Sequence, residues 1–140
     1  MTFEIISTRQ LKREIYLKKP KDIFDLVKKY AKSRQEQFLV VTLDGSNKVI
    51  SIHIMSIGLV NKTMAHPREV FYHAIKDNAV SLVLAHNHPS GHISVSEEDN
   101  EITKIIVDAS KIMKFHVIDH IIFSKSNFIS MREDGFYFGD

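Results

Sequence analysis

Apolar residues recur at helical spacing in three segments of the chain. The first segment follows Pro20, the second begins near Pro67, and the third begins at Ser96 and runs to about Lys114. In each segment the apolar residues lie three or four positions apart, as they do on the buried face of an amphipathic helix. The pattern therefore predicts three helices. The positions expected to face the core are Ile23, Val27, Tyr30, Ala31, Val70, Phe71, Ala74, Ile75, Ile102, Ile105, Ile106, Ala109 and Met113.

The segments between these helices have the composition of β-strands. Residues 36–44 (EQFLVVTLD) and 48–56 (KVISIHIMS) flank the turn sequence DGSN, which predicts an antiparallel hairpin. Residues 79–85 (AVSLVLA) do not alternate with polar residues, as expected of a central strand that is buried on both faces. The segments VIDHIIF and FISM predict a second hairpin. Strands mixed with helices throughout predict an α/β fold, a three-layer sandwich around one mixed sheet.

Length and composition favour one globular domain over residues 1–140. The chain is 44% hydrophobic and 26% charged, and no Gly, Ser or Pro-rich linker divides it. Charged residues interrupt every apolar window well short of the roughly 18 residues that a membrane helix needs, so no membrane association is expected. The N-terminus also lacks the apolar core of a signal peptide. We therefore expect the protein in the cytoplasm.

The charge is distributed unevenly along the chain. Residues 1–34 carry ten Lys/Arg and four Asp/Glu, whereas the rest of the chain has nine Lys/Arg and thirteen Asp/Glu. We interpret the first part, about residues 1–34, as a short, basic helical extension of the domain. Its lysines could form a solvated helix face or contact an acidic partner or nucleic acid.

The absence of cysteine restricts the chemistry that the chain can perform. With no thiol, disulfide bonds, thiolate zinc sites and a cysteine nucleophile are all excluded. Zinc-dependent base deaminases are excluded for the same reason, because their metal site uses cysteine. A transition-metal site in this chain must therefore be built from histidine and carboxylate.

One stretch, VSLVLAHNHPSGHISVSEED at residues 80–99, concentrates candidate chemistry. Successive side chains of a strand point to opposite faces, so His86 and His88 should project together from the end of the central strand. Pro89 and Gly91 then favour a sharp reversal of the chain. The reversal can bring Asp99, at the start of the next helix, back over the two histidines.

Two imidazoles and one carboxylate leave a fourth tetrahedral position open, as in catalytic zinc sites. A simpler interpretation also fits part of this pattern. Ser96 followed by three acidic residues is typical of a helix N-cap with favourable charges in the first turn. Isolated histidines such as His86 and His88 also often satisfy only local hydrogen bonds. The combination of strand, histidine pair and reversal favours the metal site.

The same residues resemble a known family motif. The spacing of His86, His88, Ser96 and Asp99 is similar to the JAMM motif of the MPN-type metalloproteases. The strings HNHPSG, HPRE at residues 66–69 and DHII at residues 119–122 resemble, more specifically, the RadC-like JAB domain of bacteria. This resemblance covers about residues 33–135. The letters HNH also name a nuclease motif, but its residues are not contiguous, so that match is accidental.

The resemblance implies a role for each motif residue. His86, His88 and Asp99 would bind Zn²⁺, and Ser96 would hydrogen-bond the tetrahedral intermediate. Glu36, at the start of the first hairpin strand, would be the general acid and base. The family fold is a cytidine-deaminase-like α/β sandwich with zinc at one end of the sheet. His120 follows Asp119 in DHII and either supports a ligating imidazole by a hydrogen bond or makes an ordinary core contact.

Three functions follow as hypotheses. The leading one is a zinc-dependent hydrolase that cleaves an amide bond, either a peptide or an isopeptide bond, in a peptide or protein substrate. The second is a nucleic-acid-associated accessory protein, because RadC-like proteins carry a DNA repair label. Longer relatives have a helix-hairpin-helix module, which we do not expect in the short stretch before Glu36. The third is a noncatalytic interaction scaffold, since a fold does not guarantee activity.

Overall fold

The domain is built around one mixed β-sheet. The computed structural model describes residues 4–10, 13–56 and 67–140. His66, the first residue of the HPRE string, lies outside these residues. The elements along the chain are β1 (Glu4–Gln10), α1 (Pro20–Val27), the 3₁₀ helix η1 (Lys28–Lys32), β2 (Gln37–Leu43), β3 (Val49–Ser56), α2 (Pro67–Lys76), β4 (Ser81–Asn87), α3 (Glu97–Met113), β5 (His116–Phe123) and β6 (Phe128–Ser130).

The strands of the sheet follow the order β1-β3-β2-β4-β5-β6. All neighbouring strands are antiparallel except β4 and β5, which are parallel and are connected through α3. Both predicted hairpins, β2–β3 and β5–β6, are confirmed. In the first turn the Asp44 carboxylate accepts hydrogen bonds from the backbone N–H groups of Ser46 and Lys48 at 2.8 and 3.0 Å, which stabilises the reversal.

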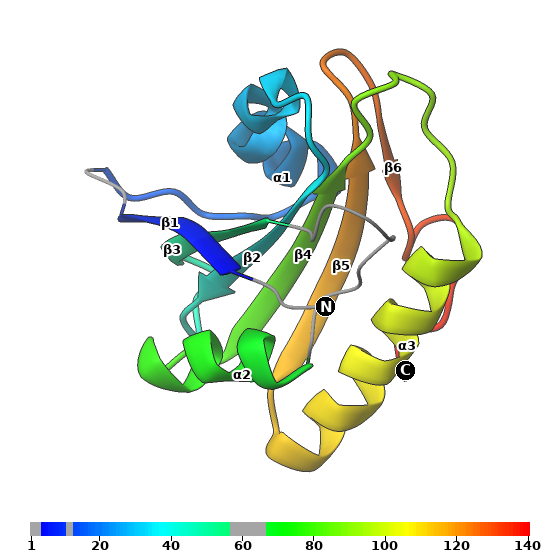
Figure 1. The fold of residues 1–140 in the computed structure, drawn as a ribbon. Coiled ribbons are helices and arrows are strands. Elements are labelled where there is room, and N and C mark those ends of the chain that lie inside the picture. Colours follow the sequence, from blue (N-terminus) through cyan, green and yellow to red (C-terminus); the bar gives the residue numbers. More distant parts are fainter. Residues whose placement is uncertain (1–3, 11–12, 57–66) are drawn as a thin grey trace.

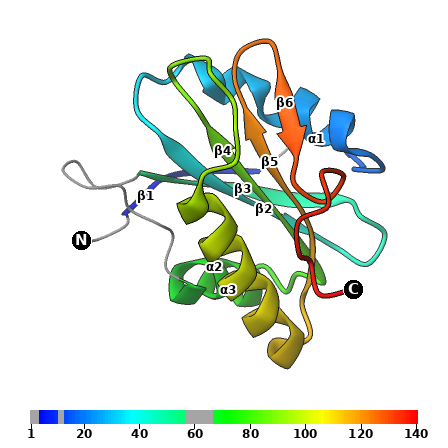
Figure 2. The same ribbon diagram turned by 90° about the vertical axis from the view of Figure 1, so that its right-hand side faces the viewer.

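Helices cover both faces of the sheet, which gives the predicted three-layer α/β sandwich (Figures 1 and 2). On one face α1 and η1 pack on the odd-numbered residues of β2, such as Leu39 and Val41. On the other face α2 and α3 pack on its even-numbered residues, such as Phe38 and Val40. All seven residues of β4 are buried, as expected for a strand covered by helices on both sides. None of the helices within the described residues is long and apolar enough to span a bilayer.

The N-terminal segment differs from the helical extension that we predicted for about residues 1–34. Glu4–Gln10 forms an edge strand paired with β3, and the helical residues in the described part of this segment are those of α1 and η1. Helix α1 buries Ile23, Phe24 and Val27 against the sheet. Helix α1 therefore belongs to the core of the domain, because its apolar stripe packs on the sheet.

The predicted inward faces of two helices are partly wrong. Ile105 and Met113 of α3 are 49% and 42% exposed, and Ile75 of α2 is 59% exposed. The inward face of α3 instead combines apolar with polar residues. Its buried members are Asp99, Ile102, Thr103, Ile106, Val107 and Ser110. Hydrophobicity alone predicts the wrong buried face for such a helix, because it assigns the polar residues to the solvent-exposed face.

Adjacent isoleucines on α3 test this orientation. Ile106 is fully buried and Ile105 is half exposed. We expect Ile106→Ala to lower the free energy of unfolding by about 2–5 kcal/mol, because the lost methyl groups leave a cavity in the core. The matched control Ile105→Ala should lower it by less than about 1 kcal/mol. Urea denaturation of the two variants measures both values, and equal losses would contradict the orientation of α3.

Candidate metal centre

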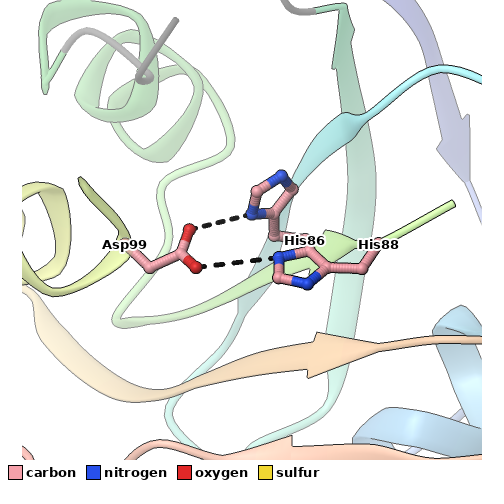
Figure 3. Close-up of side chains that lie close together, drawn as sticks. All are labelled: His86, His88 and Asp99. Carbon is pink, nitrogen blue, oxygen red and sulfur yellow. Dashed lines mark hydrogen bonds and ion pairs between the residues drawn. The ribbon is translucent and has the colours of Figure 1, made fainter. Parts of the chain in front are cut away.

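The motif residues meet at the carboxyl end of β4 (Figure 3). His86 lies in the last part of β4, and His88 follows one residue after the strand ends. The chain then reverses in a turn in which the backbone N–H of Gly91 donates to the carbonyl of His88 at 3.0 Å. Gly91 has φ +83°, a conformation that favours glycine. After this loop, α3 begins and directs Asp99 toward the two imidazoles.

Asp99 contacts both histidines through different carboxylate oxygens. Its Oδ1 lies 3.0 Å from His86 Nδ1, and its Oδ2 lies 3.7 Å from His88 Nε2. One potential ligand atom from each of the three residues lies within 4.8 Å of the other two. Among the described residues, no other group of three histidine, cysteine or carboxylate side chains is compact enough to hold a metal ion.

The N-terminus of α3 fixes the position of Asp99. The Ser96 hydroxyl accepts a hydrogen bond from the Asp99 N–H at 3.0 Å, and the Asp99 carboxylate accepts one from the Ser96 N–H at 3.1 Å. This is a capping box, so the N-cap interpretation of the sequence is confirmed. It does not compete with the metal interpretation, because the same carboxylate caps the helix and faces the imidazoles. The Ser96 hydroxyl, which accepts in the cap, keeps its own hydrogen to donate.

Glu36 lies immediately before β2, the strand that pairs with β4. The pairing of Phe38 with His86 brings this end of β2 beside the end of β4. The Glu36 carboxylate Oε2 is 3.5 Å from His86 Nε2, and its side chain is 40% exposed. The hydrogen bond from His86 lowers the pKa of Glu36, so this residue is a carboxylate at neutral pH. The structure thus brings Glu36, Ser96, His86, His88 and Asp99 together.

The electrostatics of the centre favour a bound cation. Burial disfavours the charged form of His86, but hydrogen bonds to Asp99 and Glu36 outweigh this effect and raise its pKa to about 9. Burial tends to raise the pKa of Asp99, yet its hydrogen bonds with His86 and His88 lower that pKa far below the usual range. Two carboxylates therefore hold a proton on His86 at neutral pH. A metal ion could replace that positive charge.

The donor atoms also fit a metal ion. His86 Nε2 is buried, and the Glu36 carboxylate approaches it only to 3.5 Å, the outer limit of a hydrogen bond, so the described residues satisfy this nitrogen poorly. Imidazole nitrogens and a carboxylate oxygen suit zinc and several other divalent transition metals. His86, His88 and Asp99 could therefore hold one such ion, with Glu36 beside it.

His120 supports the centre through Asp99 and not through an imidazole. Its Nδ1 lies 2.5 Å from Thr103 Oγ1, which donates to the Asp99 carbonyl at 2.6 Å. Burial lowers the pKa of His120 to about 3, so its ring is neutral. No sequence motif pointed to Thr103. Its only signal was its position one helical turn after Asp99.

Asp119, the first residue of DHII, has a structural role. Its carboxylate accepts hydrogen bonds from the Ser130 hydroxyl at 2.5 Å and from the backbone N–H of Arg132 at 3.1 Å. These contacts hold the end of β6 against β5. The side chain of Asp119 points away from the metal centre, because the neighbouring His120 lies on the face of α3.

A second buried histidine cluster was missed by the sequence analysis. The His53 ring stacks on His73 with centroids 4.3 Å apart, and His53 Nε2 lies 2.6 Å from the Asp77 carboxylate, which also accepts from Thr42 at 2.7 Å. This cluster joins α2 to β2 and β3. By contrast, His92 is exposed in the reversal loop, where its carbonyl accepts a hydrogen bond from His88 Nδ1 at 3.2 Å.

The fold and the centre together define a class of protein. Two imidazoles and a carboxylate at the carboxyl end of a central strand, in an α/β sandwich, have the form of a metallohydrolase centre. The family model of the RadC-like JAB domain matches residues 17–136. The chain therefore belongs to the RadC-like JAB domain family.

Relatives in bacteria and archaea support this membership. The chain is 43% identical over 119 residues to a UPF0758 protein of Caldanaerobacter subterraneus, a match that covers 84% of this chain and 51% of that protein. It is 38% identical over 136 residues to a UPF0758 protein of Syntrophomonas wolfei, covering 94% and 57%. A UPF0758 protein of Methanosarcina barkeri is 36% identical over 118 residues, covering 84% and 52%. The chain thus spans about half the length of the curated relatives it matches.

The raised pKa of His86 predicts how metal binding depends on pH. A ligating imidazole must be neutral, and His86, with a pKa of about 9, holds a proton at neutral pH. Lowering the pH favours that proton over the metal, so affinity should fall about tenfold per pH unit between pH 8.5 and 7. Competition with a chromophoric chelator, corrected for the chelator's own protonation, measures the slope. An affinity that does not change over this range would contradict the prediction.

Proposed function

We propose that the protein is a zinc-dependent hydrolase of the metallopeptidase type that cleaves an amide bond in a peptide or protein. The observation that carries this proposal is the convergence of Glu36 with His86, His88 and Asp99 at one end of the sheet. A metal site alone could serve structure. A metal site with an ionised carboxylate beside it, partly open to solvent, has the components of hydrolysis.

Zinc is the metal that this donor set favours for such chemistry. Three protein ligands leave one coordination position open, which is typical of catalytic zinc sites, whereas structural zinc sites use four. When bound, zinc would supply a Lewis acid that lowers the pKa of water to near neutrality. Fully closed sites also commonly use thiolates, and this chain has no cysteine.

The surrounding residues would supply proton transfer and charge stabilisation. The Glu36 carboxylate is ionised and half exposed, so it can accept a proton from the attacking water and deliver it to the departing amine. Ser96 can donate its hydroxyl hydrogen to the oxygen on which negative charge develops, while still accepting from the Asp99 N–H. Thr103 and His120 hold the backbone of Asp99 and thereby orient the carboxylate.

The alternative functions have less support from the geometry. A noncatalytic scaffold would not require Glu36 to lie beside the ligands, yet it does. Nucleic-acid binding would use the lysines of α1 and η1, which lie across the sheet from the metal centre. On α1 and η1, Lys21 and Lys28 both pair with Asp25, which reduces the local positive charge. No contact in the described part of the chain favours nucleic acid as a second function.

Metal content is the first test of this proposal. Untagged protein purified without added metal should contain about one zinc ion per chain, and Asp99→Ala should lose most of it. Asp99 is also part of the helix cap, so Ser96→Ala is the matched control. It removes the capping hydroxyl, at a cost of about 1 kcal/mol, but no ligand, and should retain zinc. Absence of metal from all three proteins, even after zinc is supplied, would reduce the motif to a helix cap.

Peptide hydrolysis tests the role of Glu36. With a library of quenched fluorescent peptides, zinc-loaded Glu36→Gln should be about 10²–10⁴-fold slower than the wild type, because it lacks the proton acceptor. Zinc content should be unchanged, since Glu36 is not one of the three proposed ligands. A zinc-loaded wild type that turns over no peptide would instead favour the noncatalytic scaffold.

A further inference from the structure

Asn87 lies between the two histidines of the motif but faces the other way. It ends β4, it is fully buried, and it pairs with Phe123 of β5, whose side chain packs on the α1 face of the sheet. His86, one residue earlier, pairs with Phe38 and Ile122, which pack on the α3 face. Because side chains alternate along a strand, Asn87 does not touch the metal centre from this side.

The Asn87 amide binds the backbone on both sides of Glu36. Its Oδ1 accepts a hydrogen bond from the Gln37 N–H at 2.5 Å, and its Nδ2 donates to the Gln35 carbonyl at 3.1 Å. The Asn87 side chain thus forms two hydrogen bonds, one as acceptor and one as donor, with the three-residue segment that has Glu36 at its centre. A buried amide satisfied in this way holds that backbone in one position.

The pairing of β2 with β3 reaches Gln37, which lies opposite Ser56, but the pairing of β2 with β4 stops short of Glu36. The pairing of β2 with β4 runs from Leu43 with Ser81 to Phe38 with His86 and ends there, two residues after Glu36 in the sequence (Figure 1 shows the two strands side by side). Beyond that point, the hydrogen bonds of the Asn87 amide and the approach of Glu36 to His86 connect the two chain segments. The amide thus continues the connection where the backbone ladder stops.

We propose that Asn87 is a positioning residue that fixes the Glu36 carboxylate relative to the metal ligands. The inference rests on the proposed hydrolase function for its catalytic consequence. Since Asn87 belongs to the same strand segment as His86 and His88, one rigid element sets the positions of two ligands and of the base. Displacement of a catalytic group by about 1 Å can reduce the rate about 10²-fold.

The test compares Asn87→Leu with Thr42→Val in the full, zinc-loaded chain. Leucine keeps the branched shape of asparagine without its hydrogen bonds. Thr42 is also buried and hydrogen-bonded, but lies near the other end of β2, so its replacement controls for general loss of buried polar contacts in this strand. Asn87→Leu should keep about one zinc per chain. If it does not fold, Asn87→Asp serves, because a carboxylate cannot donate to Gln35.

Two readouts decide the proposal. In amide hydrogen exchange followed by NMR, Gln37 should exchange at least about tenfold faster in Asn87→Leu than in the wild type or in Thr42→Val. For hydrolysis, kcat should fall about 10²-fold with an unchanged KM, whereas Thr42→Val should stay within about threefold of the wild type. For Asn87→Asp, the expected loss in kcat is about tenfold.

The outcomes separate this inference from the proposed function. Equal Gln37 exchange in Asn87→Leu and Thr42→Val, or equal kcat values, would overturn the positioning role. A wild type that binds zinc but hydrolyses nothing would overturn the hydrolase proposal alone. In that case crystal structures of the zinc-loaded wild type and Asn87→Leu, together with the exchange rates, still decide whether Asn87 fixes Glu36. An unmoved Glu36 carboxylate would exclude it.

Discussion

The contact between Asp99 and His86 is the interaction on which the rest of the centre depends. It joins the first turn of α3 to the end of β4, two elements that are otherwise connected by an exposed loop. A buried carboxylate needs a charged or hydrogen-bonded partner, because desolvation without one costs several kcal/mol, by order of magnitude. Asp99 has partners in His86, His88 and Ser96. The N-terminal end of the helix is therefore positioned by the same contacts that gather the metal-binding atoms.

This constraint also explains why the core is not purely apolar. With Asp99 turned inward, the positions one and three turns further along α3, Thr103 and Ser110, are inward too. Each satisfies its hydroxyl by donating to a backbone carbonyl, of Asp99 at 2.6 Å and of Val107 at 2.7 Å. Thr103 also meets His120, whose neutral ring can be buried at lower cost than an ion. The chemistry at one end of the helix thus determines which of its faces packs on the sheet.

Periodicity predicted the elements more reliably than it predicted their orientation. The buried central strand β4 and the two hairpins were predicted correctly, because burial on both faces and turn chemistry leave local patterns in the sequence. The predicted orientation of α3 was wrong. Hydrophobicity alone places Ile105 in the core, and it does not reveal that Thr103 has a buried partner on β5. Likewise His73 is buried on α2, where it stacks on His53 of β3. Such pairs join residues far apart in sequence and leave no local pattern.

Only part of the metal centre could be predicted from local sequence patterns. His86, His88 and Asp99 fall within fourteen residues, so strand alternation and one reversal suffice to bring them together. Glu36 lies fifty residues before His86 and was selected only through the family resemblance. Its place beside His86 requires the antiparallel pairing of β2 with β4, a long-range contact. Asn87 was overlooked although it stands inside the motif, because its partners are backbone groups of residues 35 and 37, which no side-chain pattern reveals.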